Sequence, residues 1–448
     1  MLPAPAEIGR FLLPSLIGVG AFLVPISYGG EQTILIGVLT SLLRGLLDPW
    51  LLEAVVVVTG LAAVGGTVYL PIQPDWREQR PFLYALCNVT PIWLLLRLIG
   101  FGIGLMVIFQ TGPELLWGEQ TGGTVFRDIG INSLVILCVA CQLMPFLTEF
   151  GFMEFVGTLL RGPFEKLFRL PGRSAIDATA SFLSAAAVGL LITIGQYERG
   201  YYTARESAAV ATNFSVVSLP FSLLIAQVAG ISHLYFSWYL TMILACVVCA
   251  FVMVRIPPLS RMPDRYYRDQ DQNRRVSLGT ATGGLGQQAV SAAVARAATA
   301  PGARTLIRGS LLQTVSVTFN VIPAAMALAT LTAVLVFHTP VFEILAWPIA
   351  QLLGLLQFPE AAAVAPGLVV GFLDQFMPAL IAINIDSELA RFVLAGLSVT
   401  QLIFMAEVGV LILRSVLPLR FRDLLLIFAL RTLVVFPLLT LAGLWFTT

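Results

Sequence analysis

Residues 174–196 read SAIDATASFLSAAAVGLLITIGQ, a stretch long enough to cross a bilayer but built largely of small residues, with Asp177 inside it. A second stretch, residues 361–385, reads AAAVAPGLVVGFLDQFMPALIAINI and is interrupted by proline, glycine and Asp374. Breaker residues are tolerated at membrane depth where the backbone lies inside protein or lines a cavity. Both stretches are therefore predicted to be re-entrant helical hairpins, which enter the bilayer and turn back.

Composition identifies the chain around these hairpins as a membrane protein. Of its 448 residues, 58% are hydrophobic and 11% are charged, whereas a soluble domain carries roughly 25% charged residues. This excludes a soluble enzyme, a disordered scaffold and a disulfide-rich secreted protein, and the long apolar blocks are unlike the alternating strands of an outer-membrane barrel. The net charge of +1 gives no indication of a nucleic-acid partner.

Nine apolar segments have the roughly 20 residues that a spanning helix needs. They are residues 11–28, 50–70, 82–109, 131–150, 203–230, 232–255, 313–338, 388–414 and 423–446. The predicted fold is therefore all-α: a polytopic protein of the lipid bilayer with these nine transmembrane helices and the two hairpins.

A polar stretch at residues 257–305 sets the orientation. It is charged in its first half and rich in Gly and Ala in its second, which is typical of a flexible linker. The positive-inside rule places this Arg-rich linker in the cytoplasm. Counting spans from it predicts an inner-membrane protein with its N-terminus inside and its C-terminus outside.

The two hairpins belong to an internal repeat. Placing Pro171 on Pro359 also places Thr212 on Thr400 and Asn213 on Gln401, with one offset of 188 residues. The predicted units are scaffold helices at residues 1–125, a first repeat at 126–256, the linker, and a second repeat at 306–448. By the predicted topology the repeats are inverted, as in secondary transporters. A duplication kept only for stability is the alternative.

One region resembles a known family. Residues 172–189 (GRSAIDATASFLSAAAVG), 197–208 (YERGYYTARESA) and 211–221 (ATNFSVVSLPF) resemble the YjiH type of nucleoside-recognition Gate-domain membrane protein. Gate domains are related to concentrative nucleoside transporters, and Asn213-Phe214-Ser215 is similar to a stretch that those carriers use at the substrate. The carriers' hairpin Gln/Thr/Glu cluster has no clear counterpart here. The resemblance implies a homo-oligomer, with a second Gate-domain membrane protein as a further candidate partner.

Polar residues of the hairpins and of the spans that follow them form the predicted site. The candidates for binding a small polar solute are Ser181, Ser184, Asn213, Phe214, Ser215, Ser218, Gln375, Thr400 and Gln401. The candidates for coupling to Na⁺ or H⁺ are Asp177, Asp374 and Glu407, because an ionisable group at membrane depth is a functional hypothesis by default. The alternatives are structural. Asp177 pairs with Arg173 or caps a helix, the Asn213 group only joins helices, and Glu407 forms an ion pair.

Two further features are predicted to be structural. Arg97 lies within an apolar span and is expected to pair with Glu53 or Glu149. The pairs Cys138/Cys141 and Cys246/Cys249 have metal-ligand spacing, but they lie in apolar spans without polar neighbours and are expected to pack as small hydrophobes. No cofactor or metal is expected, and no nucleophile–base or metal constellation indicates an enzyme.

Together these patterns predict an ion-coupled secondary transporter of a small polar organic solute, nucleoside-like or amino-acid-like, in the cytoplasmic membrane. The hairpin units would move against a scaffold made from the first three helices. The alternative is a non-transporting membrane sensor or partner protein that binds a small solute in the same pocket.

Overall fold

The computed structural model describes residues 5–28, 31–72, 79–183, 186–217, 219–267 and 284–447, and most of them are helical. The N-terminal elements are α1 (Pro5–Phe22), β1 (Pro25–Tyr28), β2 (Glu31–Ile34), α2 (Leu35–Leu47), η1 (Asp48–Trp50), α3 (Leu51–Ile72), α4 (Pro81–Cys87), α5 (Pro91–Phe109), α6 (Glu114–Trp117), η2 (Glu119–Gly123) and η3 (Val125–Gly130). Strands β1 and β2 pair in an antiparallel two-stranded sheet.

The remaining elements lie on either side of residues 268–283, which the structure does not describe. The first set is α7 (Ile131–Leu143), α8 (Pro145–Thr148), α9 (Phe152–Leu159), α10 (Arg161–Leu167), α11 (Ser174–Leu183), α12 (Ala186–Glu198), α13 (Ala204–Asn213), α14 (Leu219–Val228), η4 (Ser232–Leu234), α15 (Tyr235–Met253) and η5 (Leu259–Arg261). The second set is α16 (Leu285–Ala298), α17 (Ala303–His338), α18 (Val341–Leu355), α19 (Ala361–Val370), α20 (Met377–Ala382), α21 (Glu388–Thr400), η8 (Met405–Gly409), α22 (Val410–Arg414) and α23 (Phe421–Phe446).

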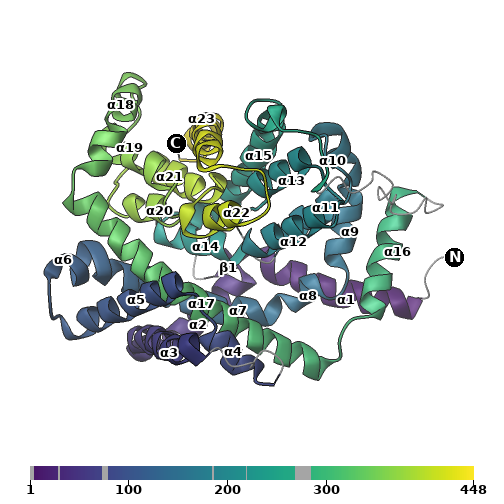
Figure 1. Cartoon of the computed structure of the whole chain (residues 1–448), viewed down its shortest axis with the longest axis horizontal. Helices are drawn as coiled ribbons and strands as arrows, with labels where there is room; N and C mark the ends of the chain where they lie inside the picture. The colour runs from purple at the N-terminus through teal and green to yellow at the C-terminus, as the bar shows by residue number, and fades with distance from the viewer. Residues whose placement is uncertain are drawn as a thin grey trace.

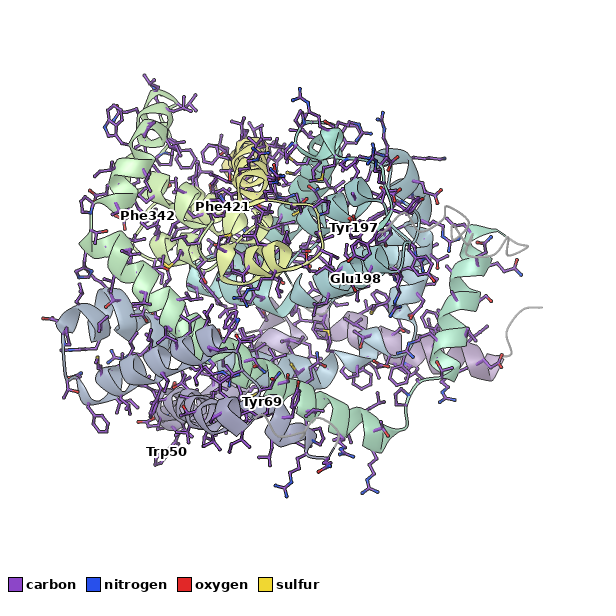
Figure 2. The ribbon with its side chains drawn as sticks, in the orientation of Figure 1. Trp50, Tyr69, Tyr197, Glu198, Phe342 and Phe421 are labelled. Atoms are coloured by element: carbon purple, nitrogen blue, oxygen red, sulfur yellow. The ribbon has the colours of Figure 1, made fainter. Side chains whose placement is uncertain are left out.

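The chain is a multi-pass membrane protein. Six helical segments among the described residues are long and apolar enough to cross a bilayer: Leu35–Ile72, Pro91–Phe109, Val125–Leu143, Ser232–Met253, Ala303–His338 and Phe421–Phe446. Large apolar side chains are exposed on them, as lipid contact requires. Trp50, for example, is 71% exposed. Trp50 and Tyr69 lie on one side of α17, and Phe421 and Tyr197 lie on the other (Figure 2).

The long helix α17 separates two groups of helices. Helices α3, α4 and α5 pack against one side of it, and the two hairpins lie with α13, α15, α21 and α23 on the other side (Figure 1). In this second group α23 lies between α15 and α21 and contacts both (Figure 1). The helices that carry the predicted site are therefore gathered on the side of α17 opposite α3, α4 and α5 (Figure 1).

Five of the nine predicted spans do not form one continuous α-helix, since residues 82–109 are divided between α4 and α5 and residues 131–150 between α7 and α8. Residues 11–28 are divided between α1 and β1, and the nine-span count stays a prediction. The predicted helix over 203–230 ends at Asn213 and resumes as α14, which we name the first break. The predicted helix over 388–414 ends at Thr400 before η8 and α22, which we name the second break.

Each break has a local cause. Residue 220 is a proline, whose nitrogen cannot donate the hydrogen bond that a continuous helix over 203–230 would need. Leu402 has a φ of 59°, in the left-handed region that a right-handed helix excludes. The two breaks therefore leave backbone carbonyl groups without helical partners at the ends of α13 and α21.

The repeat stays a prediction, and the order of the elements is compatible with it. The pairs α11 and α19, α13 and α21, α14 and η8, and α15 and α23 begin 184 to 187 residues apart, close to the predicted offset. The contacts between repeats are reciprocal. Helix α12 of the first hairpin contacts η8 and α22, and α20 of the second hairpin contacts α14. Each hairpin therefore rests on the half-helix that follows the break in the other repeat.

Both predicted hairpins form pairs of helices that contact each other, α11 with α12 and α19 with α20. Gly189 allows the close approach in the first pair, since a Cβ atom at this position would lie 2.3 Å from the Cβ of Ser181. The turn between α19 and α20 contains Asp374. The small and breaker residues that predicted these hairpins therefore lie where two helices approach closely or where the chain turns.

The predicted flexible linker differs from the structure. Residues 285–298 within it form α16, which packs against α1 and α9, while residues 268–283 lie outside the described part of the chain. Ala289, Ala293 and Ala297 are fully buried along one side of α16. Alanines spaced four apart share one helical face, which permits close packing of α16 against its neighbours. The Gly- and Ala-rich composition of this segment predicted a flexible linker because it does not take this spacing into account.

Candidate functional site

Arg431 of α23 joins the two breaks. Its side chain is fully buried. Nη1 donates to the carbonyl oxygen of Thr212 at 3.3 Å and to Oδ1 of Asn213 at 2.8 Å. Nε donates to the carbonyl oxygens of Thr400 at 3.2 Å and Gln401 at 3.0 Å, and Nη2 donates to Thr400 at 2.7 Å. One guanidinium therefore binds the ends of α13 and α21 together.

The charge of Arg431 is balanced by dipoles. The carbonyl groups at a helix C-terminus lack helical partners and carry the negative end of the helix dipole, and Arg431 meets two such ends. No carboxylate in the described part of the chain lies within 4 Å of its guanidinium nitrogens. Arg431 is not among the residues predicted for the site, although it is the single cation within the apolar segment 423–446 and this signal could have identified it.

Two of the candidate residues at the first break, Asn213 and Ser215, are buried. Asn213 is 1% exposed, and its Nδ2 donates to the carbonyl oxygen of Ala209 at 3.0 Å, which leaves its Oδ1 directed at Arg431. Ser215 is also buried and donates to the carbonyl oxygen of Ala211 at 2.8 Å. Ser218 lies outside the described residues.

Phe214 lies among other aromatic side chains. Its ring centroid is 4.8 Å from that of Phe164 and 5.0 Å from that of Phe168, both on or next to α10. Among the described contacts, Phe214 therefore packs the first break against α10, while its neighbour Asn213 faces Arg431.

Thr400 and Gln401 line the second break. Thr400 Oγ1 donates to the carbonyl oxygen of Gly396 at 2.7 Å. Gln401 Nε2 donates to the carbonyl oxygen of Leu368 in α19 at 3.0 Å and to Oγ1 of Thr432 at 2.8 Å. Gln401 thus ties the second hairpin to α23, while its buried Oε1 has no hydrogen-bond partner among the described residues.

The turn of the second hairpin is fixed to the second break. The carbonyl oxygens of Phe372 and Leu373 accept from the backbone nitrogens of Met405 and Ala406 at 2.8 and 2.9 Å. Asp374 is 4% exposed, and its Oδ1 accepts from the backbone nitrogen of Phe376 at 2.8 Å.

Two further candidates, Gln375 and Glu407, lie at this turn and at the second break. The buried Oε1 of Gln375 has no partner among the described atoms. The backbone of Glu407 lies in η8, and its side chain lies outside the described part of the chain.

Asp177 of the first hairpin has a phenol as its partner. Tyr202, fully buried between α12 and α13, donates from its hydroxyl to Oδ2 of Asp177 at 2.5 Å. Burial, together with the charge of Asp177, raises the pKa of Tyr202 well above its ordinary value, so the hydroxyl remains a donor. Arg173 lies nearby with its guanidinium carbon 3.8 Å from the ring centroid of Tyr201.

One of the two other candidates in the first hairpin belongs to the described part of the chain. Ser181 is buried in α11, and its Oγ has no partner among the described residues. Ser184 lies outside the described part of the chain.

The predicted pairing of Arg97 is wrong. Its side chain is 1% exposed and donates to Oδ1 of Asn320 at 2.6 Å and to three backbone carbonyl groups, those of Ala62, Leu86 and Asn88. Glu149 instead accepts from Arg296 of α16 at 2.5 Å. Arg97 joins α3, α4 and α17, which agrees with its predicted scaffold role but not with the predicted partners.

A polar cavity lies between α2, α7 and α14. Its volume is about 360 Å³, and its lining is Thr40, Ser41 and Arg44 of α2, Asp128 of η3, Asn132 of α7, Gln227 and Val228 of α14, and Ile383 after α20. Arg44 donates to Oδ1 of Asn132 at 2.8 Å. Thr40 is 2% exposed, and its Oγ1 has no partner among the described residues. The cavity therefore offers one cation, one carboxylate, amides and hydroxyl groups, which suits a small polar ligand.

Comparisons with known proteins agree with part of the sequence analysis. Residues 131–232 match the Gate family model, described as nucleoside recognition. Uncharacterized protein BpOF4_10220 of Alkalihalophilus pseudofirmus is 40% identical over 431 residues, which cover 96% of this chain and 93% of that protein.

Two solved structures are similar over nearly the whole chain. CNTnw in an inward-facing substrate-bound state is 15% identical, with a TM-score of 0.42, and covers 97% of this chain and 99% of its own. A CNTnw double variant in an outward-facing state is also 15% identical, with a TM-score of 0.42 and 99% coverage of both chains. The Gate match confirms the predicted resemblance over residues 131–232, which include the first hairpin, the first break and Asn213.

Proposed function

The chain belongs to the family of Uncharacterized protein BpOF4_10220, with a Gate segment at residues 131–232, and from this premise we propose that it is a secondary transporter. Its cargo is a small polar organic solute, nucleoside-like or amino-acid-like, and it acts in the cytoplasmic membrane. The observation that carries the proposal is the meeting of two broken helices, α13 and α21, at the buried Arg431.

Broken helices need a functional reason in a membrane. Each break exposes backbone groups that water cannot satisfy in the hydrocarbon core, so breaks persist where protein or a cavity satisfies them. Two continuous helices would pack equally well, so packing alone does not explain the breaks. Secondary transporters place such breaks near the bilayer midplane, at the interface between repeats, where they form the solute site. The arrangement of α13, α21 and α23 fits this plan.

The hairpins are suited to opening the site alternately to the two sides. In the proposal, 174–196 and 361–385 enter the bilayer from opposite faces, with the N-terminus inside and the C-terminus outside. Each hairpin rests on the half-helix of the other repeat, α12 on η8 and α22, and α20 on α14. A displacement of one hairpin therefore shifts the wall of the site built by the other repeat. The helices of residues 1–125, which include α3 and α5, provide the fixed scaffold.

The polar cavity is the proposed entrance from outside. The predicted topology places all of its lining elements at the outer end of the protein. Helix α14 leads from the first break to Gln227 at the cavity, and its ten residues span about 15 Å. The described part of the cavity thus lies one short helix away from Asn213.

Coupling to Na⁺ or H⁺ is proposed to involve Asp177, Asp374 and Glu407. The described side chains of Asp177 and Asp374 are both buried without a basic partner within 4 Å, which is costly for an ionised carboxylate and favours an ion or proton at each. A homo-oligomer assembled through the scaffold helices, with a second Gate-domain protein as a further candidate partner, completes the proposal.

The test is uptake into proteoliposomes that contain the full chain. Labelled uridine and labelled serine are supplied separately, each with an imposed Na⁺ or H⁺ gradient. We expect uptake of one solute class above that of empty vesicles. Asn213→Ala should reduce this uptake at least about tenfold, because Arg431 loses an acceptor at the solute site. Asn384→Ala, which changes an exposed amide, is the matched control.

Two results contradict transport. Absence of uptake for both solutes, with a folded protein in the vesicles, argues against these cargoes. Thermal stabilisation by a solute without any uptake would instead support the sensor alternative.

A further inference from the structure

The oxygens around Arg431 form a set that suits a metal cation. The carbonyl oxygens of Thr212, Thr400 and Gln401 and the amide oxygen of Asn213 all lie within 3.3 Å of its nitrogens. They are neutral, and the carbonyl groups come from the C-terminal ends of two half-helices. In transporters with broken helices, unwound carbonyl groups and half-helix C-termini are the groups that coordinate Na⁺. Hard cations prefer such oxygen ligands.

The guanidinium of Arg431 occupies the space between these four oxygens and carries a permanent positive charge. It is planar, remains protonated in proteins and directs its N–H groups in fixed directions, and here three nitrogens reach the ends of both α13 and α21. The side chain is covalently part of α23 and cannot dissociate during a transport cycle. A Na⁺ ion bound to the same oxygens would stand within a few ångströms of a second positive charge in a low-dielectric interior, where the repulsion is strong.

We propose that Arg431 is a built-in replacement for a coupling cation, so that the junction of the two broken helices needs no Na⁺. This inference rests on the proposed function because it concerns the same site. It limits the places where a coupling ion can bind: an ion-driven cycle would bind its ion away from the junction, at Asp177, Asp374 or Glu407. It also predicts that removal of the guanidinium frees a set of four oxygens that Na⁺ can occupy.

The experiment measures thermal unfolding of the detergent-solubilised full chain in NaCl and in choline chloride at equal ionic strength. The triple variant Asp177→Asn, Asp374→Asn and Glu407→Gln removes the other proposed Na⁺ sites and retains Arg431, and for it we expect no Na⁺-specific change in the unfolding midpoint. In that background, Arg431→Ala should lower the midpoint in choline chloride, and Na⁺ should raise it again by about 2 °C or more, in a saturable manner.

Two further variants keep the result interpretable. Arg431→Lys retains a positive charge and should remain insensitive to Na⁺, and Arg422→Ala removes an exposed arginine from the same helix as a matched control. The proposal is overturned if Na⁺ saturably stabilises the protein that retains Arg431 in the triple-variant background. It is also overturned if folded Arg431→Ala shows no response to Na⁺.

The proposal can still be refuted if the Arg431→Ala variant does not fold. In that case Arg431→Gln, whose neutral side chain fills more of the same space, takes its place with the same expected response to Na⁺. No step of this experiment uses a transported solute. A negative uptake experiment would therefore reject the proposed function, whereas a wrong Na⁺ response would reject only the role given to Arg431.

Discussion

Arg431 Nη1 lies 2.8 Å from Asn213 Oδ1, although the two residues are 218 positions apart in the chain. The same guanidinium holds the carbonyl oxygen of Thr400 at 2.7 Å. The ends of two helices from different repeats are thereby fixed to a third helix, α23. A solute or ion that changes the position of either break must also change these hydrogen bonds, so Arg431 is placed to couple the two repeats.

Tyr202→Phe tests the support of Asp177. The change removes the hydroxyl that donates to Asp177 Oδ2 and leaves a buried carboxylate without this donor. We expect a loss of about 1–3 kcal/mol in the free energy of unfolding, measured by chemical denaturation in detergent. Tyr201→Phe is the matched control, because phenylalanine retains the ring beneath Arg173. Equal stability of the two variants would show that the Tyr202–Asp177 hydrogen bond contributes little to the free energy of unfolding.

Gly371→Ala tests the space that the second hairpin leaves for Gln401. A Cβ atom at position 371 would lie 2.0 Å from Gln401 Oε1, so the amide has to shift, and its hydrogen bonds to Leu368 and Thr432 are weakened. We expect uptake to fall at least about tenfold and the unfolding midpoint to decrease. Gly354→Ala, where no atom lies within 4 Å of the added carbon, should leave both unchanged. Unaltered uptake by Gly371→Ala would disprove a role for this contact.

Asp128→Asn tests the cavity as an entrance. The substitution keeps the shape of the lining but removes its carboxylate, so a solute that carries a positive group should bind it less tightly. The expected result is a KM for uptake increased about three- to tenfold with kcat unchanged, from initial rates in proteoliposomes. Arg127→Gln, which breaks an exposed pair with Glu119, is the control. A change in kcat alone would contradict the entrance role.

Arg296→Ala tests the attachment of α16. Arg296 pairs with Glu149 at 2.5 Å and with Glu154 at 3.6 Å. Burial raises the pKa of Glu154, while the charge of Arg296 acts to lower it. A raised carboxyl pKa favours stability at low pH, where the group is protonated, and costs stability as pH rises.

The loss of stability caused by Arg296→Ala should therefore be greater at pH 7.5 than at pH 5. Thermal unfolding of wild type and variant at the two pH values measures this difference, with Arg304→Ala, in the first turn of α17, as the control. A loss that does not depend on pH would indicate that Arg296 acts through packing alone.

The site could be predicted from sequence only where its signals were local. The small residues of 174–196 and the prolines and glycines of 361–385 indicated closely packed helix pairs, and the structure contains both pairs. The offset that placed Thr212 on Thr400 found the two helix ends that Arg431 joins. Arg97 was correctly assigned to the scaffold, but with the wrong partners, since a buried guanidinium is satisfied by backbone carbonyl groups as well as by carboxylates.

Sequence alone determined that this protein is helical and lies in a membrane, because hydropathy and residue size act over a few neighbouring positions, whereas the repeat stays a prediction. Tertiary structure decided that Arg431 lies at the junction of the breaks, that Tyr202 is the partner of Asp177, and that residues 285–298 form a packed helix. These relationships depend on which helices come together. A hydrogen bond requires its partners within about 3 Å of each other, a distance that composition and spacing along the chain do not specify.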